Sequence, residues 1–243
     1  MSKLVYKFLS EDMALKVLNE KRLKVSLLPE LNDVHDCRPI LFPPSDDDDE
    51  HSQESWTEKV IDTASKRSGL LCFSGDPKSA AVWGLYAESG SGIALEFDSQ
   101  KLSDGENDLG YGHNPMIIDY VTNRPKCRSA CDWEIDGDYI DAMVRALYGS
   151  KSKEWEFERE VRLIMHLPSC VPDQGRYFVG FPVGALTSVI LGYKSALDPV
   201  YLCRLLSRLW GENIPPEIKR AVPDEKTFSV NIEKISPPPR SQQ

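Results

Sequence analysis

Residues Lys153 to His166, KEWEFEREVRLIMH, are the stretch around which we expect the fold to be built. Apolar and acidic residues alternate along it, which predicts a half-buried β-strand. Its apolar side comprises Trp155, Phe157, Val161, Leu163 and Met165, and its other side comprises Glu154, Glu156, Glu158 and Glu160, with Arg162 beyond them. Successive carboxylates would lie roughly 6.5–7 Å apart on one face of such a strand. Their mutual repulsion is expected to raise the pKa of at least one of them, so a cationic group should face this row.

Two interpretations of the glutamate row remain open. It is either the solvated face of an edge strand, where Glu is common, or the acidic wall of a functional cleft. The sequence of this stretch alone does not separate the two, so the rest of the chain has to decide.

The composition describes a chain that can fold but has few basic residues. It has 243 residues, of which 41% are hydrophobic, and its formal net charge is −9. Such an acidic chain is not expected to bind nucleic acid non-specifically, because that binding depends on many basic contacts to phosphates. No apolar run approaches the ~18 residues of a membrane span, and we see no signal-peptide pattern. These features predict a soluble, cytoplasmic protein that does not bind membranes.

The remaining segments predict an α+β domain with a mainly antiparallel sheet and flanking helices. No nucleotide-binding glycine loop and no internal repeat is visible. The strands are predicted at residues 3–9, 24–28, 70–74, 92–97, 115–121, 177–179, 186–191 and 227–235. One helix is predicted to begin after Ser10, and the others at residues 56–68, 77–89, 138–148 and 198–210. We expect one domain over residues 1–236, with a mobile acidic loop at 43–54 (PPSDDDDEHSQE) and a disordered tail at 237–243.

The six cysteines are expected to be free thiols, because a chain without a secretion signal rarely forms disulfides. Cys127 and Cys131 have a C-x3-C spacing, but no second close pair completes a zinc site. The four adjacent aspartates near His51 cannot all reach one ion from a rigid frame. We therefore expect no metal site.

Several segments, in order and over nearly the whole chain, resemble the bacterial family called domain of unknown function 2971. They are YKFLSEDMALKVL, LPELNDVHDC, CFSGDPKSAAVWGLYAESGSGIALEFD, IIDYV, KSKEWEFEREVRLI, VILG and the last alternating strand. Each motif is weak, but their order and spacing are specific. The name of the family implies no activity.

A more distant resemblance, to ADP-ribosyltransferases of the DarT kind, implies a split sheet and a reaction with NAD. The opening strand and helix are similar to the start of those enzymes, CFS and the following helix to their second motif, and Glu158-Arg159-Glu160 to their E-x-E motif. The resemblance implies that Glu160 stabilises an oxocarbenium-like ribose and that Glu158 activates the acceptor as a general base. It further implies roles in NAD binding for Lys7, Ser74, Trp83 and Tyr86. The acceptor would be an unidentified macromolecule or nucleotide, in a toxin or phage-defence context.

The chain also departs from the family pattern. Relatives tend to carry histidines in a W-x-H-Y-A-x-x-H-x-G segment, where this chain has Leu85 and Gly90. Lys7 stands where the clearest ADP-ribosyltransferases have His or Arg. The alternative function is therefore a non-catalytic binding module with a degenerate site, in which Lys7 and Ser74 are surface or capping residues and Trp83 and Tyr86 belong to the core.

Overall fold

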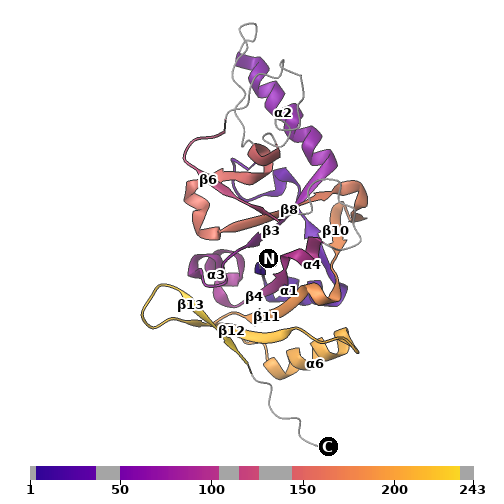
Figure 1. Ribbon diagram of the computed structural model, residues 1–243, viewed down its shortest axis with the longest axis vertical. Helices are drawn as coiled ribbons and strands as arrows, with labels where there is room; N and C mark the ends of the chain where they lie inside the picture. Colours follow the sequence, from indigo (N-terminus) through magenta and orange to yellow (C-terminus); the bar gives the residue numbers. More distant parts are fainter. Residues whose placement is uncertain (1–3, 37–49, 104–114, 126–143, 236–243) are drawn as a thin grey trace, which may run out of the picture.

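The computed structural model describes residues 4–36, 50–103, 115–125 and 144–235 (Figure 1). They form an α+β structure whose sheets are mainly antiparallel, as predicted. The strands are β1 Leu4–Leu9, β2 Arg22–Val25, β3 Ser68–Ser74, β4 Ile93–Asp98, β5 Met116–Ile117, β6 Asp119–Val121, β7 Ser150–Ser152, β8 Glu160–His166, β9 Val171–Asp173, β10 Arg176–Gly180, β11 Leu186–Leu191, β12 Glu217–Pro223 and β13 Val230–Lys234. The helices are α1 Glu11–Glu20, α2 Glu50–Arg67, α3 Ala80–Tyr86, α4 Ser99–Ser103, residues 144–149 and α6 Pro199–Trp210, with 3-10 turns η1 Leu28–Glu30, η2 Glu88–Gly90, η3 Lys153–Glu158, η4 Leu167–Ser169 and η5 Val183–Ala185.

The main sheet has eight strands in the order β13-β12-β11-β4-β1-β3-β8-β5. Only its β11–β12 pair is parallel, because α6 carries the chain back between those strands. The three strands that contain Tyr6, Phe73 and Glu160 are neighbours in this order. Two smaller sheets, β2-β10-β9 and β6-β7, complete the described structure.

The main sheet is divided where β1 meets β3. These strands pair at a single position, Tyr6 with Ser74, whereas β1 pairs with β4 at six positions and β3 with β8 at seven. Figure 1 shows the two parts one above the other, with β3 and β8 above β4, β11 and β12. The sheet is therefore split.

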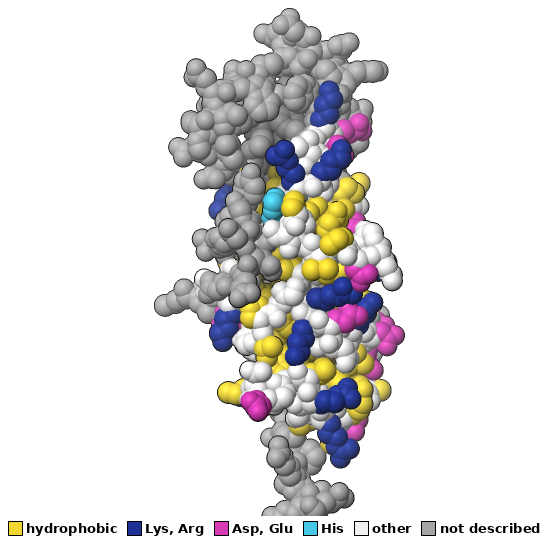
Figure 2. Space-filling model, turned by 90° about the vertical axis from the view of Figure 1, so that its right-hand side faces the viewer, with side chains coloured by type: hydrophobic (Ala, Val, Ile, Leu, Met, Phe, Trp, Pro, Cys, Tyr) yellow, Lys and Arg dark blue, Asp and Glu magenta, His cyan; other side chains and the backbone are white. Residues whose placement is uncertain are grey.

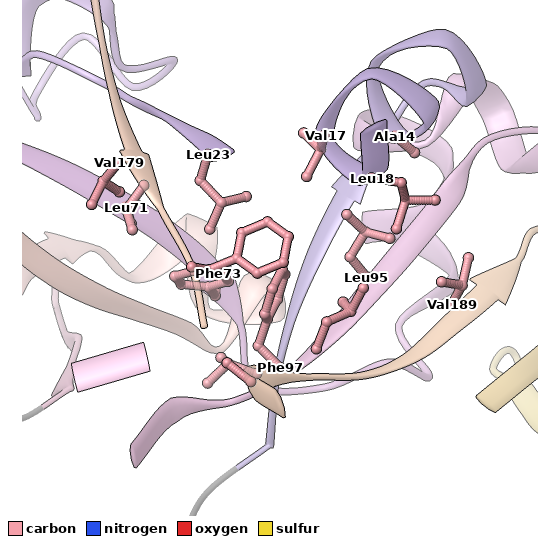
Figure 3. Close-up of a cluster of buried hydrophobic side chains, with 14 of the residues drawn as sticks. Ala14, Val17, Leu18, Leu23, Leu71, Phe73, Leu95, Phe97, Val179 and Val189 are labelled. Atoms are coloured by element: carbon pink, nitrogen blue, oxygen red, sulfur yellow. The ribbon is translucent and has the colours of Figure 1, made fainter. Parts of the chain in front are cut away.

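Most of the hydrophobic core lies on one face of this sheet. Phe73, Leu95 and Phe97 pack there against Leu18 of α1 and Leu23 of β2 (Figure 3). The aromatic ring of Phe97 makes edge contacts with those of Phe73 and Phe181. The alternation of strand residues 161–165 explains their part in this core, because Val161, Leu163 and Met165 all point into it.

The opposite face carries α3 and a smaller core. Trp83 is fully buried there and packs edge-on against Phe8, with the ring centroids 4.9 Å apart. Ser79 caps this helix by accepting a hydrogen bond from the backbone N–H of Val82. Tyr6 and Phe8 of this smaller core, and Tyr86, which packs against it, line the pocket described below.

Two predictions about local structure were wrong. Residues 153–158 form the 3-10 turn η3 and not the first half of a strand, so β8 begins only at Glu160. Residues 50–54, predicted as part of the acidic loop, belong to the first turns of α2; acidic residues are favourable at a helix N-terminus. The remainder of that loop, residues 43–49, the tail and the Cys127–Cys131 pair lie outside the described residues. Cys72, Cys170 and Cys203 are free thiols.

Candidate functional site

A pocket of about 230 Å³ opens where the sheet is split. Its lining residues come from β1, β3 and α3, from η1 and the residues beside it, and from β7, η3 and β8. The lining comprises Tyr6, Lys7, Phe8, Ser26, Glu30, Leu31, Asn32, Cys72, Phe73, Ser74, Val82, Tyr86, Lys151, Glu158 and Glu160. Five of the six residues predicted to form a site, taken from four separate segments, therefore surround one pocket.

Five charged side chains are buried together behind this pocket. They are Asp36, Lys151, Glu158, Glu160 and Arg162, and none is more than 6% exposed. We call them the buried charge cluster. It contains one more carboxylate than cation, so the wall that it presents to the pocket carries a net negative charge when all five groups are ionised.

Lys151 holds the two glutamates together. Its Nζ donates hydrogen bonds to Glu158 Oε2 at 2.6 Å and to Glu160 Oε2 at 3.1 Å, and it lies 3.6 Å from Asp36 Oδ2. A cation therefore faces the glutamates, as the sequence predicted. Burial alone would lower the pKa of Lys151, but the three carboxylates outweigh it and raise that pKa, so the ammonium stays charged.

Both side-chain oxygens of Glu160 accept hydrogen bonds from Arg162. Arg162 donates from Nε to Oε1 at 2.8 Å and from a terminal nitrogen to Oε2 at 2.9 Å. Burial alone would raise the pKa of Glu160, but Arg162 and Lys151 lower it to about 2. The prediction that repulsion would raise a pKa in the glutamate row is thus wrong for Glu160, because cations surround it.

The turn η3 explains why only part of the glutamate row is buried. Arg159 adopts a left-handed conformation (φ 46°), and Ser74 Oγ donates a hydrogen bond to the backbone oxygen of Glu158 at 2.6 Å. This turn directs Glu158 into the pocket, while Glu154 and Glu156 remain exposed as predicted. Ser74 thus supports Glu158 through its backbone.

Glu158 is the carboxylate of the cluster that accepts a hydrogen bond from Tyr86. The Tyr86 hydroxyl donates to Glu158 Oε1 at 2.5 Å, and Asn32 donates its side-chain N–H to the Tyr86 oxygen. Burial and the neighbouring Glu158 raise the pKa of Tyr86, so its hydroxyl keeps its proton. Asn32, Tyr86 and Glu158 therefore form a hydrogen-bonded chain along the pocket wall.

Lys7 is the pocket cation that has no carboxylate partner among the described residues. Its Nζ donates one hydrogen bond, to the backbone oxygen of Cys72 at 2.8 Å, and lies 5.9 Å from the centre of the Phe73 ring. An ammonium group has three donors, so Lys7 can bind an acceptor of a ligand without breaking this contact.

Trp83 does not line the pocket. Its ring is buried in the smaller core and its indole N–H donates to the backbone oxygen of Pro77 at 2.8 Å. Of the two aromatic residues proposed to stack on nicotinamide, Tyr86 alone lines the pocket, and the alternative assignment of Trp83 to the core is the one that the structure shows.

Leu85 and Gly90, which stand where relatives tend to carry histidines, have different surroundings. Leu85 is exposed. Gly90 has a φ of +90°, and a Cβ atom there would overlap the ring of Tyr193. Tyr193 thus fills the space that a side chain at residue 90 would need.

The sequence pointed to Arg162, but sequence reasoning missed Lys151, Asp36 and Asn32. Arg162 had a detectable signal, because it continues the polar side of β8 beyond Glu160. Lys151 and Asp36 had none, since nothing in a polar loop or a three-residue strand marks a residue that tertiary contacts will bury.

No group of three or more His, Cys, Asp or Glu residues in the described parts of the chain could hold a metal ion. No helix there is long and apolar enough to cross a membrane. On the face shown in Figure 2, basic side chains are interspersed with acidic and hydrophobic ones.

Comparison with known proteins gives one family match, over part of the chain. No curated protein and no solved structure matches the chain, so the more distant resemblance to DarT-like ADP-ribosyltransferases is not confirmed. Residues 82–163 match the model of a family described as "Protein of unknown function (DUF2971)". That segment carries Tyr86, Lys151, Glu158, Glu160 and Arg162, most of the site described above. The predicted resemblance to this family is confirmed over residues 82–163, about a third of the chain.

Proposed function

We propose that this protein is an NAD-dependent enzyme of the ADP-ribosyltransferase kind, which cleaves the bond between nicotinamide and ribose. One observation carries the proposal: Lys7, Ser74, Tyr86, Glu158 and Glu160, named from the sequence for this chemistry, surround a single pocket at a split in the sheet. Residues chosen for their chemistry from four separate segments would rarely gather by chance.

The pocket fits one end of a dinucleotide. Its volume of about 230 Å³ is below the ~300–1,000 Å³ of sites that enclose a drug-sized ligand. The nicotinamide and its ribose would enter it beside Tyr86, whose ring can pack against a flat aromatic group. Lys7 would bind the phosphate or ribose side of the same molecule, because its ammonium has donors to spare.

The negative wall of the pocket suits the transition state of this reaction. When the C1′–N bond breaks, its electron pair leaves with nicotinamide and positive charge develops on the ribose. A fixed carboxylate stabilises such a charge without moving. Glu160, held by Arg162 and Lys151, would act through its charge in this way.

Glu158 would serve as the general base. The lone pair of the acceptor forms the new bond to C1′, and the proton that the acceptor loses passes to the Glu158 carboxylate. Tyr86 and Ser74 fix the position of this carboxylate and of its backbone. The acceptor would be a macromolecule or nucleotide. A toxin or phage-defence role is implied only by the DarT-like resemblance.

The decisive experiment measures NAD binding and nicotinamide release by the purified protein. We expect release by the wild type and a loss of at least about 100-fold in Glu158→Gln, because general-base catalysis contributes typically 10²–10⁴-fold. Glu154→Gln, an exposed glutamate in the same turn, is the matched control and should retain full activity. Failure of the wild type to bind NAD, or full turnover by Glu158→Gln, would refute the proposal.

A second candidate function is a non-catalytic binding module. The observation that favours it is the pairing of both Glu160 oxygens with Arg162, which a purely structural glutamate would also show. This alternative predicts saturable ligand binding, with no release of nicotinamide by the wild type or by Glu158→Gln.

A further inference from the structure

The backbone N–H of Glu160 donates to a tyrosine side chain. Its acceptor is the hydroxyl oxygen of Tyr120, at 2.7 Å. On the same side of β8, the backbone N–H of Ile118, the residue after β5, donates to the Glu160 oxygen at 3.2 Å. Hydrogen-bonded residues of a regular antiparallel pair exchange both N–H···O bonds. Here the bond that Glu160 would return to Ile118 goes to the Tyr120 hydroxyl, so a side chain replaces the backbone at the end of this ladder.

The strand that carries Tyr120 meets the three segments that supply the charged groups of the pocket. Tyr120 lies opposite Lys151 in the parallel β6–β7 pair. Strand β6 also packs against η3, which carries Glu158. The Tyr120 hydroxyl holds Glu160, the first residue of β8. Lys151, Glu158 and Glu160 are therefore all supported from β6.

The spacing between β7 and β8 determines the hydrogen bonds of Lys151. Its Nζ lies 2.6 Å from Glu158 Oε2 and 3.1 Å from Glu160 Oε2. Strand β8 belongs to the main sheet, whereas β7 belongs to the separate β6–β7 sheet. The ladder of the main sheet therefore does not set this spacing, and the bond from the Tyr120 hydroxyl to β8 links the two sheets.

We propose that Tyr120 is a positioning residue, whose hydroxyl sets the spacing between the strand of Lys151 and the strand of Glu160. The inference rests on the proposed function for its effect on turnover, but not for its effect on the ion pairs. Without the hydroxyl, the Glu160 N–H loses its acceptor, which is costly for a buried donor. Strand β8 can then shift relative to β7, and the bonds from Lys151 to the two glutamates lengthen.

The first test compares nicotinamide release from NAD by the wild type and by Tyr120→Phe, which keeps the ring and removes the acceptor oxygen. We expect kcat to fall about 10-fold or more, because small displacements of reacting groups have large effects on rate. KM for NAD should stay close to the wild-type value, because Tyr120 is not among the described residues that line the pocket. Tyr201→Phe, at an exposed tyrosine of α6, is the matched control and should behave like the wild type.

The second test needs no turnover and separates positioning from a hydrogen bond that is merely structural. Urea unfolding of the wild type and Tyr120→Phe is measured at pH 7 and at pH 3. Burial above all, with the charges of Glu160 and Glu158, raises the pKa of Tyr120 to about 12, so this hydroxyl does not titrate in that range. Loss of a neutral hydrogen bond alone would lower the urea midpoint equally at both pH values.

Positioning predicts an unequal loss. The groups that surround Glu160 are Asp36, Cys72, Lys151, Glu158 and Arg162. Arg162 moves with Glu160 on β8, whereas Lys151 on β7 does not. A weaker contact with Lys151 raises the lowered pKa of Glu160, which removes stability above the unfolded-state pKa and less of it at acidic pH. The urea midpoint of Tyr120→Phe should therefore fall further at pH 7 than at pH 3.

The outcomes separate this proposal from the proposed function. An unchanged kcat in Tyr120→Phe beside an active wild type, or an equal fall of the urea midpoint at both pH values, would overturn the role of Tyr120 alone. A wild type without turnover, together with the unequal fall, would refute the proposed function and support this role. If Tyr120→Phe does not fold, hydrogen exchange of the wild type decides: the Glu160 amide should exchange slowly, and exchange as fast as that of an unprotected amide would overturn the proposal.

Discussion

Lys151 shows how one buried residue can determine a site. Its ammonium lies within 3.6 Å of three carboxylates that come from two distant parts of the chain. Burying such a charge is favourable only while its partners are present. The residue therefore fixes the geometry of Glu158 and Glu160, whatever the ligand of the pocket.

We expect Lys151→Met to destabilise the protein strongly. Removing one partner from a buried ion pair typically costs about 3–5 kcal/mol, because the other charges are left uncompensated. Urea unfolding of the variant and of Lys153→Met, at an exposed lysine two residues away, measures the difference. A loss below about 1 kcal/mol would show that the cluster does not depend on this ammonium.

Glu160 should make stability depend on pH in the acidic range. Its pKa is about 2 in the folded protein, below the ordinary glutamate value of 4.5. A lowered folded-state pKa stabilises the protein above the unfolded-state pKa, and this contribution is lost as the pH falls from about 5 to about 2. It amounts to something on the order of 3 kcal/mol.

The measurement compares urea unfolding of the wild type and Glu160→Gln between pH 7 and pH 3. The advantage of the wild type should shrink as the pH falls, because Glu160 takes up a proton in the unfolded state at a higher pH than in the folded state. A difference independent of pH would contradict the lowered pKa.

At the scale of elements, the period-two pattern of residues 153–166 was correct for one half and wrong for the other. From Glu160 onward, the alternation places Val161, Leu163 and Met165 in the core, as predicted. Before it, the chain forms η3, because Lys151 and Ser74 draw Glu158 inward and no partner of that kind binds Glu154 or Glu156. An alternating sequence pattern indicates which residues are buried, but it does not indicate a tertiary contact that bends the backbone.

The left-handed Arg159 at the end of η3 gives a test of this turn. Residues other than glycine pay roughly 1–2 kcal/mol in that conformation. Arg159→Gly should therefore be more stable than Arg159→Ala by about 1 kcal/mol. Both variants lose the ion pair with Asp76, so their difference in thermal unfolding reports the backbone alone. Equal stability would argue against this turn.

At the scale of the whole molecule, the sequence predicted the α+β class and brought β1, β3 and β8 together. It did not predict β12, whose partly exposed residues lie between Pro216 and Pro223 and show no clear apolar face. It also did not predict the parallel return through α6 or the β6–β7 pair, because strands of three residues carry too little pattern. For the site, five of six residues gathered around one pocket, and Trp83 did not, because an indole ring in a small-residue helix fits a core equally well.

Gly90 and Tyr193 join distant parts of the molecule, and their contact can be tested. Gly90→His should destabilise by roughly 2–4 kcal/mol, because the positive φ and the Tyr193 ring both oppose a side chain there. Tyr193→Ala in the same chain should restore part of that loss. Thermal unfolding of both single variants and of the double variant gives the coupling. Purely additive effects would contradict the contact.

The same contact limits how the family can vary. A relative with a histidine at the position of Gly90 needs space that this chain fills with Tyr193, so the two positions should change together during evolution. A histidine could enter this lineage only after, or together with, a smaller residue at 193. The packing of the Tyr193 ring thereby constrains the order in which these two substitutions can occur.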